Sequence, residues 1–311
     1  MKPTKPNPKT AGKNPVKELL KKGQPAVGIV ISVNNVEVAT QAAALGFDFL
    51  WLEMEHTPVS LETVRNVVLA TRGLPAVPFA RPPVNELWMA KRVLDCGVLG
   101  VIFPFTSTPE LARQAAAACR YPPQGLRGSG ADLAHFSWPA AEDYYAFADQ
   151  NVMVVAVVEN TLAVSHIEEI AAVPGIDVLF IGTSDLSFSL GLRGKQDHPR
   201  LEEAIARIVA AGQRHGKILG RPGLRPDQIK QFQDQGFQFF MAGTDTDFMA
   251  AGGWYTYNDV PGDVAMKRFS IARVRFACAF YLVTVKSALV SPLTATCFDA
   301  GFAPSCHATT L

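Results

Sequence analysis

The sequence predicts an α/β protein of the (β/α)8 (TIM) barrel class. From residue 25 to about residue 253, eight short apolar, β-branched runs alternate with amphipathic helical stretches. Near-continuous apolar strands separated by helices are typical of a parallel sheet whose outer face is covered, and eight strands is the number that closes a barrel. A doubly wound open sheet is the alternative, but no Gly-x-Gly-x-x-Gly motif follows the first strand.

The individual elements follow one another at regular spacing. The expected strands are Val27–Ser32, Phe47–Met54, Ala76–Ala80, Gly100–Phe103, Val152–Val158, Asp177–Ile181, Lys217–Leu219 and Gln238–Ala242. The expected helices are Val36–Leu45, Leu61–Arg72, Glu86–Cys96, Pro109–Cys119, Leu162–Val173, Leu201–His215 and Pro226–Gln235. Gly or Pro commonly marks the junctions, as such residues do where a regular element ends.

Three segments fall outside this alternation. Residues 1–24 are rich in Lys, Pro and Asn and are expected to form a disordered arm. The segment from Arg120 to about Gln150 is predicted as a long loop after the fourth strand, a length that usually indicates a functional or disordered loop. Residues 254–311 are predicted as an atypical C-terminal extension, either an added helix and tail or sequence foreign to the barrel.

Composition limits the classes of function. A net charge of +1 provides no electrostatic attraction for nucleic acid or an anionic membrane. The five cysteines form no Cys-x-x-Cys pair, so neither a zinc site nor a disulfide framework is indicated. The chain shows no signal-peptide pattern and no apolar run long enough to span a membrane. We therefore expect a cytoplasmic protein with no nucleic-acid or membrane partner.

Two acids directly follow apolar strands. Glu159 ends the run 154–158, and Asp185 follows the run 178–184. In a (β/α)8 barrel the carboxyl ends of the strands form the active face, so both carboxylates are expected at one rim. Carboxylate oxygens are the ligands that Mg²⁺ and Mn²⁺ prefer. Ion pairing with an arginine such as Arg81 is the structural alternative.

Other strand ends also carry polar side chains. Glu53, Glu55 and His56 follow the second strand, and Arg81 ends the third between prolines that restrict its backbone. A guanidinium there suits a bidentate carboxylate clamp, whereas His56 could instead cap the next helix. Asp95 lies near a helix end, an unfavourable place for an anion, which indicates either a specific partner or ordinary solvation.

Several motifs occur together in a recognisable order. They are Glu55-His56-Thr57-Pro58, Arg81, Leu94-Asp95-Cys96-Gly97, the stretch from Arg120 to Gly128 that reads RYPPQGLRG, Glu159 and Gly182-Thr183-Ser184-Asp185-Leu186-Ser187. From about Val27 to Asp247 the chain resembles the HpcH/HpaI aldolase/citrate lyase family of metal-dependent pyruvate aldolases. Among fungal members it looks closest to one that decarboxylates oxaloacetate and uses the resulting enolate, and Trp51 fits that comparison.

The resemblance implies a divalent metal, with Mg²⁺ favoured over Mn²⁺ or Co²⁺, and a small 2-oxo acid substrate. Glu159 and Asp185 would be the metal ligands, Arg81 would hold the oxo-acid oxygens, and His56, paired with Asp95, would handle protons. A supporting role at the substrate is implied for Trp51, Glu53, Glu55, Ser184 and Arg127. The resemblance also implies a homo-oligomer, a hexamer in which a C-terminal helix packs on a neighbouring subunit.

Two positions depart from the family pattern: Val157 stands where Gln is common, and Glu53 stands where aldolase members favour Asp. The expected function is carbon–carbon cleavage of 2-oxo acids through a pyruvate enolate, by retro-aldol cleavage, oxaloacetate decarboxylation or both. An enolate-trapping enzyme and a catalytically silent barrel with a binding or assembly role are the alternatives. A Schiff-base aldolase is disfavoured because Lys217 begins a strand and Lys91 lies on a helix.

Overall fold

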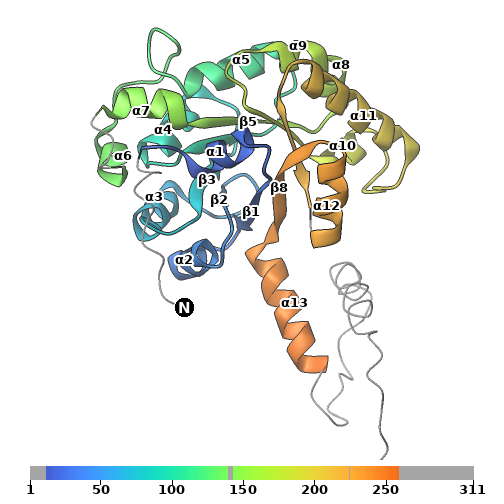
Figure 1. Cartoon of the computed structure of the whole chain (residues 1–311), viewed down its shortest axis with the longest axis horizontal. Helices are drawn as coiled ribbons and strands as arrows, with labels where there is room; N and C mark the ends of the chain where they lie inside the picture. Colours follow the sequence, from blue (N-terminus) through green and yellow to red (C-terminus); the bar gives the residue numbers. More distant parts are fainter. Residues whose placement is uncertain (1–11, 139–142, 224, 259–311) are drawn as a thin grey trace, which may run out of the picture. The chain divides into compact units, whose positions relative to one another are not determined.

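The structure is a computed structural model of the 311-residue chain and describes residues 12–138, 143–223 and 225–258. Eight parallel strands close into a barrel in sequence order, with the last strand paired to the first (Figure 1). The strands are β1 (Ala26–Ile31), β2 (Phe49–Glu53), β3 (Val77–Arg81), β4 (Gly100–Phe103), β5 (Met153–Val158), β6 (Val178–Ile181), β7 (Ile218–Pro222) and β8 (Phe237–Thr244). The predicted (β/α)8 barrel is confirmed.

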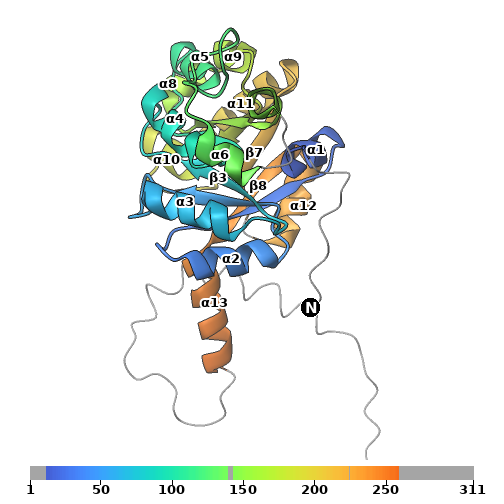
Figure 2. The ribbon, with the colours of Figure 1, turned by 90° about the vertical axis from the view of Figure 1, so that its left-hand side faces the viewer.

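Helices surround the strands, and α2 and α3 pack side by side outside β1 and β2 (Figures 1 and 2). Those expected from the sequence are α2 (Val36–Ala44), α3 (Leu61–Ala70), α4 (Leu87–Asp95), α5 (Pro109–Ala118), α11 (Pro199–Arg214) and α12 (Pro226–Asp234). The single helix predicted over 162–173 is instead two, α8 (Thr161–Ser165) and α9 (Ile167–Ala172), with His166 between them.

The described residues also contain helices that were not predicted. The segment predicted as a loop over 120–150 contains α6 (Asp132–Ser137) and α7 (Tyr144–Asn151), and α10 (Thr183–Ser189) follows β6 almost directly. The last described helix, α13 (Asp245–Asn258), continues past residue 253. Most of the predicted C-terminal extension, residues 259–311, lies outside the described residues. Among the helices that the structure describes, none is long and apolar enough to cross a membrane.

The prediction of a disordered arm over residues 1–24 is corrected for its second half. Helix α1 (Pro15–Lys21) buries Val16 and Leu20, which are four residues apart and therefore lie on one helix face. Asn14 caps this helix through its side chain and is itself fully buried. The sequence did not indicate this helix, because Val16 and Leu20 stand within a stretch that is otherwise mostly polar. Residues 1–11 lie outside the described residues.

Aromatic rings fill the interior of the barrel. Phe49 stacks on Phe239 with ring centroids 4.4 Å apart, and Phe79 lies 5.2 Å from Phe49. Gly28 on the neighbouring strand makes room for this layer, because a Cβ atom there would lie 2.2 Å from the Phe49 ring. Phe180 lies edge-on to Phe239 at 6.3 Å. These rings pack as one aromatic layer inside the barrel.

A buried carboxylate joins the last strand to the first at that end. Asp245, which follows β8, accepts hydrogen bonds from the backbone N–H groups of Ser32 and Val33, both at 3.1 Å, and from the Ser32 hydroxyl. These bonds connect the residue that follows β8 to the segment that follows β1.

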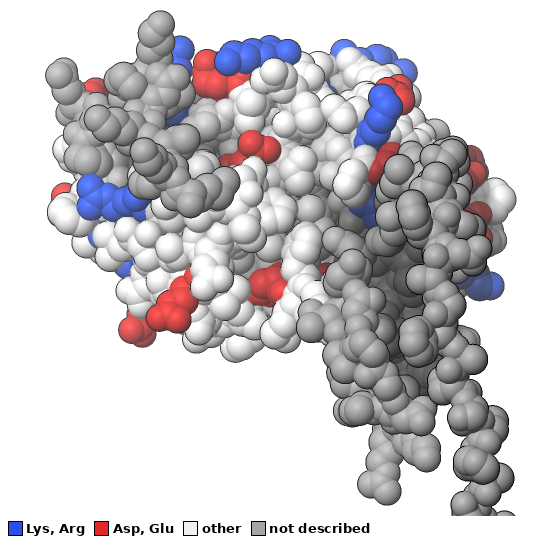
Figure 3. All heavy atoms as spheres, turned by 60° about the horizontal axis from the view of Figure 1, so that its bottom comes forward, with Lys and Arg blue, Asp and Glu red and all other residues white. Residues whose placement is uncertain are grey.

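On the face shown in Figure 3, Lys and Arg side chains are dispersed and form no continuous basic patch.

Replacing the buried cap of α1 tests the correction to the N-terminal arm. Asn14 donates to the carbonyl oxygens of Leu99 at 3.1 Å and Asn151 at 2.9 Å, and its backbone N–H donates to the Asn151 side chain at 2.6 Å. We expect Asn14→Ala to lower the free energy of unfolding by roughly 2–3 kcal/mol, because it removes the cap of α1 and the hydrogen bonds that the buried side-chain amide donates. Urea denaturation measures this, with exposed Lys13→Ala as the control; equal stability of the two variants would contradict the burial of Asn14.

Candidate active site

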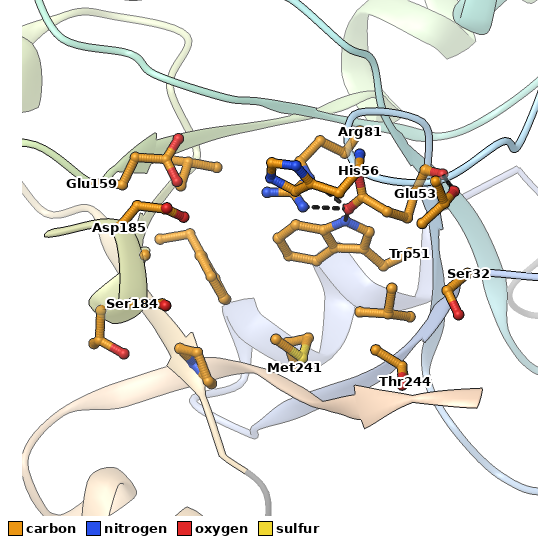
Figure 4. A pocket seen from close by; sticks show the side chains of 17 residues that line it. Ser32, Trp51, Glu53, His56, Arg81, Glu159, Ser184, Asp185, Met241 and Thr244 are labelled. Atoms are coloured by element: carbon orange, nitrogen blue, oxygen red, sulfur yellow. Dashed lines mark hydrogen bonds and ion pairs between the residues drawn. The ribbon is translucent and has the colours of Figure 1, made fainter. Parts of the chain in front are cut away.

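A cavity of about 310 Å³ opens at the carboxyl ends of the strands (Figure 4). It brings together seven of the site residues predicted from the sequence: Trp51, Glu53, His56, Arg81, Glu159, Ser184 and Asp185. The remaining walls come mainly from the interior faces of β1, β5, β6, β7 and β8. Parallel closure of the barrel therefore assembles predicted site residues that are up to 134 positions apart in the sequence, from Trp51 to Asp185.

Glu159 is the most deeply buried acid of the cavity, only 2% exposed. One carboxylate oxygen accepts the backbone N–H of Phe105 at 2.7 Å. The other lies where a Cβ atom on residue 182 would intrude at 2.8 Å, so Gly182 provides the space for it. Burial raises the pKa of Glu159 to about 7, against the lowering effect of the Phe105 N–H. Its ionised form is therefore poorly solvated by the protein alone.

Phe105 positions Glu159 and was missed as a site residue. The sequence offered only its place, directly after the fourth strand and Pro104. Its backbone has φ of 45°, the left-handed region that non-glycine residues rarely adopt, and this conformation aims its N–H at the Glu159 carboxylate. A strained backbone of this kind has no signal in residue type, because Phe carries no preference for positive φ.

Asp185 lies in the first turn of α10 rather than on a strand end. Gly182 precedes this helix, and an acid in the first turn is favoured by the helix dipole. Figure 4 shows the Asp185 and Glu159 carboxylates on the same side of the cavity. The described residues include no group of three or more His, Cys, Asp or Glu side chains arranged to hold a metal. Two carboxylates fit Mg²⁺, which is commonly bound by one or two carboxylates together with water and substrate oxygens.

Arg81 is held by two acids on the other side of the cavity. Its Nε donates to Glu53 at 2.6 Å, and its Nη1 lies 3.0 Å from the Glu55 carboxylate. The Trp51 ring lies beneath the guanidinium at 5.4 Å, and the indole N–H donates to the same Glu53 oxygen at 3.0 Å. The Arg81 guanidinium is thus fixed in orientation by its neighbours, since each contact restricts it from a different direction.

Glu55 is the second acid near the cavity whose pKa is raised. Burial raises its pKa to about 7, Arg81 lowers it, and the negative charges of Glu53 and Asp185 raise it further. His56, next in the sequence, has a largely exposed side chain whose Nε2 lies 3.5 Å from the Glu55 carboxylate. The imidazole is therefore at the opening of the cavity. It does not cap α3, because Ser60 accepts the Thr63 N–H in that position.

The expected pairing of His56 with Asp95 is not found in this chain. Asp95 ends α4, and a helix that follows a barrel strand runs back to the amino ends of the strands, away from His56. Asp95 is instead bound by Arg127 at 3.1 Å. Arg127 is only 1% exposed and lies against the Tyr121 ring at 4.7 Å. Neither Asp95 nor Arg127 lines the cavity of this chain, so the roles expected for them at the substrate stay predictions.

The described residues that line the cavity include no lysine. Lys217 donates to the backbone carbonyls of Val173 at 2.8 Å and Ile176 at 2.9 Å, where the chain approaches the amino end of β6. These bonds occupy the ammonium in a structural role.

Fold and site together define a (β/α)8 barrel enzyme whose mouth holds a carboxylate pair opposite a fixed arginine. Residues 27–251 match the HpcH/HpaI aldolase/citrate lyase family, and the chain belongs to that family. The membership confirms the enzyme class expected from the sequence, a carbon–carbon lyase, and members of the family depend on a divalent metal.

Individual relatives cover most of the chain. It is 35% identical over 237 residues to the hydroxypyruvate/pyruvate aldolase of Cupriavidus necator, which covers 75% of this chain and 87% of the relative. It is 36% identical over 245 residues to the 4-hydroxy-2-oxo-heptane-1,7-dioate aldolase of Salmonella paratyphi A, which covers 77% and 92%.

Solved structures show the same fold. A family protein from Burkholderia cenocepacia superposes with a TM-score of 0.73 at 31% identity, over 79% of this chain and 99% of that one. Macrophomate synthase, a TM-score of 0.68 at 20% identity over 78% and 87% of the two chains, supports the fold alone.

The raised pKa of Glu159 predicts a stability gain when its charge is removed. The ionised carboxylate is disfavoured in the folded state, so its cost is absent below pH 4.5, grows as the pH rises toward 7 and is complete above it. In a chelator at pH 8 we expect Glu159→Gln to stabilise the protein by roughly 1–3 kcal/mol, with little gain at pH 4.5. Thermal unfolding measures this against Glu202→Gln, an exposed acid on α11. A destabilised Glu159→Gln at pH 8 would contradict the assigned burial cost.

Proposed function

We propose that this protein is a divalent-metal-dependent pyruvate aldolase that cleaves 4-hydroxy-2-oxo acids into pyruvate and an aldehyde. The observation that carries the proposal is the carboxylate pair Glu159 and Asp185, which faces Arg81 across one cavity in a chain similar to two named aldolases. Decarboxylation of oxaloacetate is a second candidate reaction of the same site, because it releases the same pyruvate enolate.

Glu159 and Asp185 are the residues proposed to hold the metal, with Mg²⁺ favoured. The donor set supports this choice, because it consists of hard carboxylate oxygens without a sulfur or imidazole ligand. A divalent cation held by these two residues would supply Lewis-acid polarisation of a bound 2-oxo acid. The buried Glu159 carboxylate would then gain the opposite charge that the protein itself does not provide.

The cleavage step needs a proton acceptor and a place for developing negative charge. We assign the acceptor to His56, whose imidazole lies at the cavity opening and takes the proton of the 4-hydroxyl group. The C3–C4 bond then breaks, its electron pair moves to the keto oxygen as an enolate, and an aldehyde leaves. Arg81 is assigned to that oxygen because its guanidinium is already oriented by Glu53 and Glu55. A proton added at C3 completes pyruvate.

The protein is further proposed to be a cytoplasmic homo-oligomer, a hexamer by its resemblance to the family. Light scattering of the full chain tests the number of subunits. A monomeric mass at micromolar concentration would contradict this part of the proposal.

Removing either proposed metal ligand is expected to abolish turnover without unfolding the protein. We expect Glu159→Gln and Asp185→Asn each to lower kcat/KM at least about 100-fold, because an amide oxygen lacks the charge that holds the cation. Pyruvate release from a 4-hydroxy-2-oxo acid in Mg²⁺, with and without a chelator, measures this. The exposed Asp234→Asn serves as the control. Chelator-resistant turnover in wild type, or full activity in both variants, would refute the metal assignment.

The fork geometry of Arg81 is expected to be essential as well as its charge. A lysine ammonium cannot bond Glu53 and Glu55 and also reach the enolate oxygen, so Arg81→Lys should lower kcat roughly 10–1,000-fold. Steady-state kinetics with saturating Mg²⁺ measure this. The control is Arg113→Lys, because Arg113 forms an exposed ion pair with Glu110 on α5. Wild-type kcat in Arg81→Lys would remove Arg81 from the proposed mechanism.

A further inference from the structure

The cavity contains one permanent positive charge, and that charge is already engaged. Arg81 is the only Lys or Arg among the described residues that line it. Its guanidinium contacts the carboxylates of Glu53 and Glu55. Two further cations, Arg193 and Lys195, follow α10, but both are exposed to solvent and do not line the cavity. Among the described lining residues, no second Lys or Arg is therefore available to pair with a further carboxylate on a substrate.

Negative charge predominates around the same space. Glu53, Glu159 and Asp185 line the cavity, and Glu55 adds a fourth carboxyl group through its contact with Arg81. One guanidinium and one divalent cation would balance part of this charge, and the carboxylate of a bound 2-oxo acid would add to it. A further carboxylate at the far end of a substrate would enter a region where negative charge predominates, and repulsion from the buried Glu53 and Glu159 would oppose its binding.

The remaining walls are apolar and the space is small. The apolar side chains that line it are Val30, Trp51, Val157, Phe180, Pro222 and Met241. A volume of about 310 Å³ lies at the small end of the 300–1,000 Å³ that ligand pockets span. A 2-oxo acid occupies part of it, which leaves room for a short partner. Burying an unpaired carboxylate against such walls is costly, whereas an alkyl group gains from the contact.

We propose that the aldehyde partner of this aldolase is short and uncharged, and that the site discriminates against partners with a second carboxylate. This inference rests on the proposed aldolase function and narrows its substrate class. It differs from what the name of the Salmonella paratyphi A relative states, since a heptane-1,7-dioate carries a carboxylate at each end.

Binding of matched 2-oxo acids tests the proposal without turnover. 2-Oxohexanoate and 2-oxoadipate both have six carbons, and they differ in that the second carries a carboxylate at the far end. Calorimetric titration of the Mg²⁺-loaded full chain is expected to give a Kd at least about tenfold lower for 2-oxohexanoate. In aldol addition to pyruvate, butanal is expected to exceed succinic semialdehyde in kcat/KM by a similar factor. Equal values, or a preference for the dicarboxylate or the semialdehyde, would overturn the proposal.

A charge placed on the cavity wall should reverse the preference. Met241 comes from β8 and lies on that wall (Figure 4), and its length is close to that of lysine. We expect Met241→Lys to tighten 2-oxoadipate binding at least about tenfold relative to 2-oxohexanoate, because it supplies the missing cation. Met241→Gln, of similar length but neutral, is expected to leave the ratio unchanged. An unchanged ratio in Met241→Lys, or an equal shift in Met241→Gln, would contradict the charge argument.

Exchange of the pyruvate methyl protons with deuterated water separates this inference from the proposed function. Exchange requires enolate formation but no aldehyde. An enzyme that exchanges yet prefers charged partners overturns only the inference on substrate class. If the wild-type enzyme with Mg²⁺ does not exchange these protons, the aldolase proposal itself is overturned. Thermal unfolding of Met241→Lys beside wild type checks that this variant is folded.

Discussion

Closure of eight parallel strands is the constraint on which every functional side chain of this protein depends. Pairing of β8 with β1, reinforced by Asp245 bound to the Ser32 and Val33 backbone, brings the carboxyl ends of all strands to one rim. Below that rim the stacked Phe49 and Phe239 rings fill the interior. Polar chemistry is consequently confined to one end of the barrel, and residues from distant parts of the sequence meet there.

The electrostatics of the rim follow from this confinement. The rim carries four carboxyl groups and the Arg81 guanidinium, which contacts two of them, and burial raises the pKa of both Glu55 and Glu159 to about 7. Burial of these carboxyl groups is unfavourable for the protein by itself, and the cation proposed to bind Glu159 and Asp185 would offset that cost. The strained backbone of Phe105 serves the same arrangement, because it directs an N–H to one oxygen of Glu159. The positive φ of Phe105 destabilises the backbone locally and at the same time fixes the position of the Glu159 carboxylate.

The barrel could be predicted because each strand is a local apolar run, and the rim residues could be predicted because they follow those runs directly. What failed depended on contacts between distant segments. Asp95 pairs with Arg127 because α4 returns to the amino ends of the strands, a direction that motif spacing does not convey. Helix α1 was missed because only Val16 and Leu20 anchor it within a polar stretch. The role of Phe105 lies in its backbone angle, which its residue type does not indicate.

Glu159 and Asp185 are proposed to hold the cation that binds a 2-oxo acid. The most direct measurement is a crystal structure with Mn²⁺ and pyruvate, in which anomalous scattering locates the metal independently of the protein model. We predict a single strong anomalous peak bonded to one oxygen from each of the two carboxylates, with the carboxylate and keto oxygens of pyruvate completing its ligands. A manganese ion bound elsewhere, or pyruvate in the cavity without a metal between the two acids, would contradict the claim.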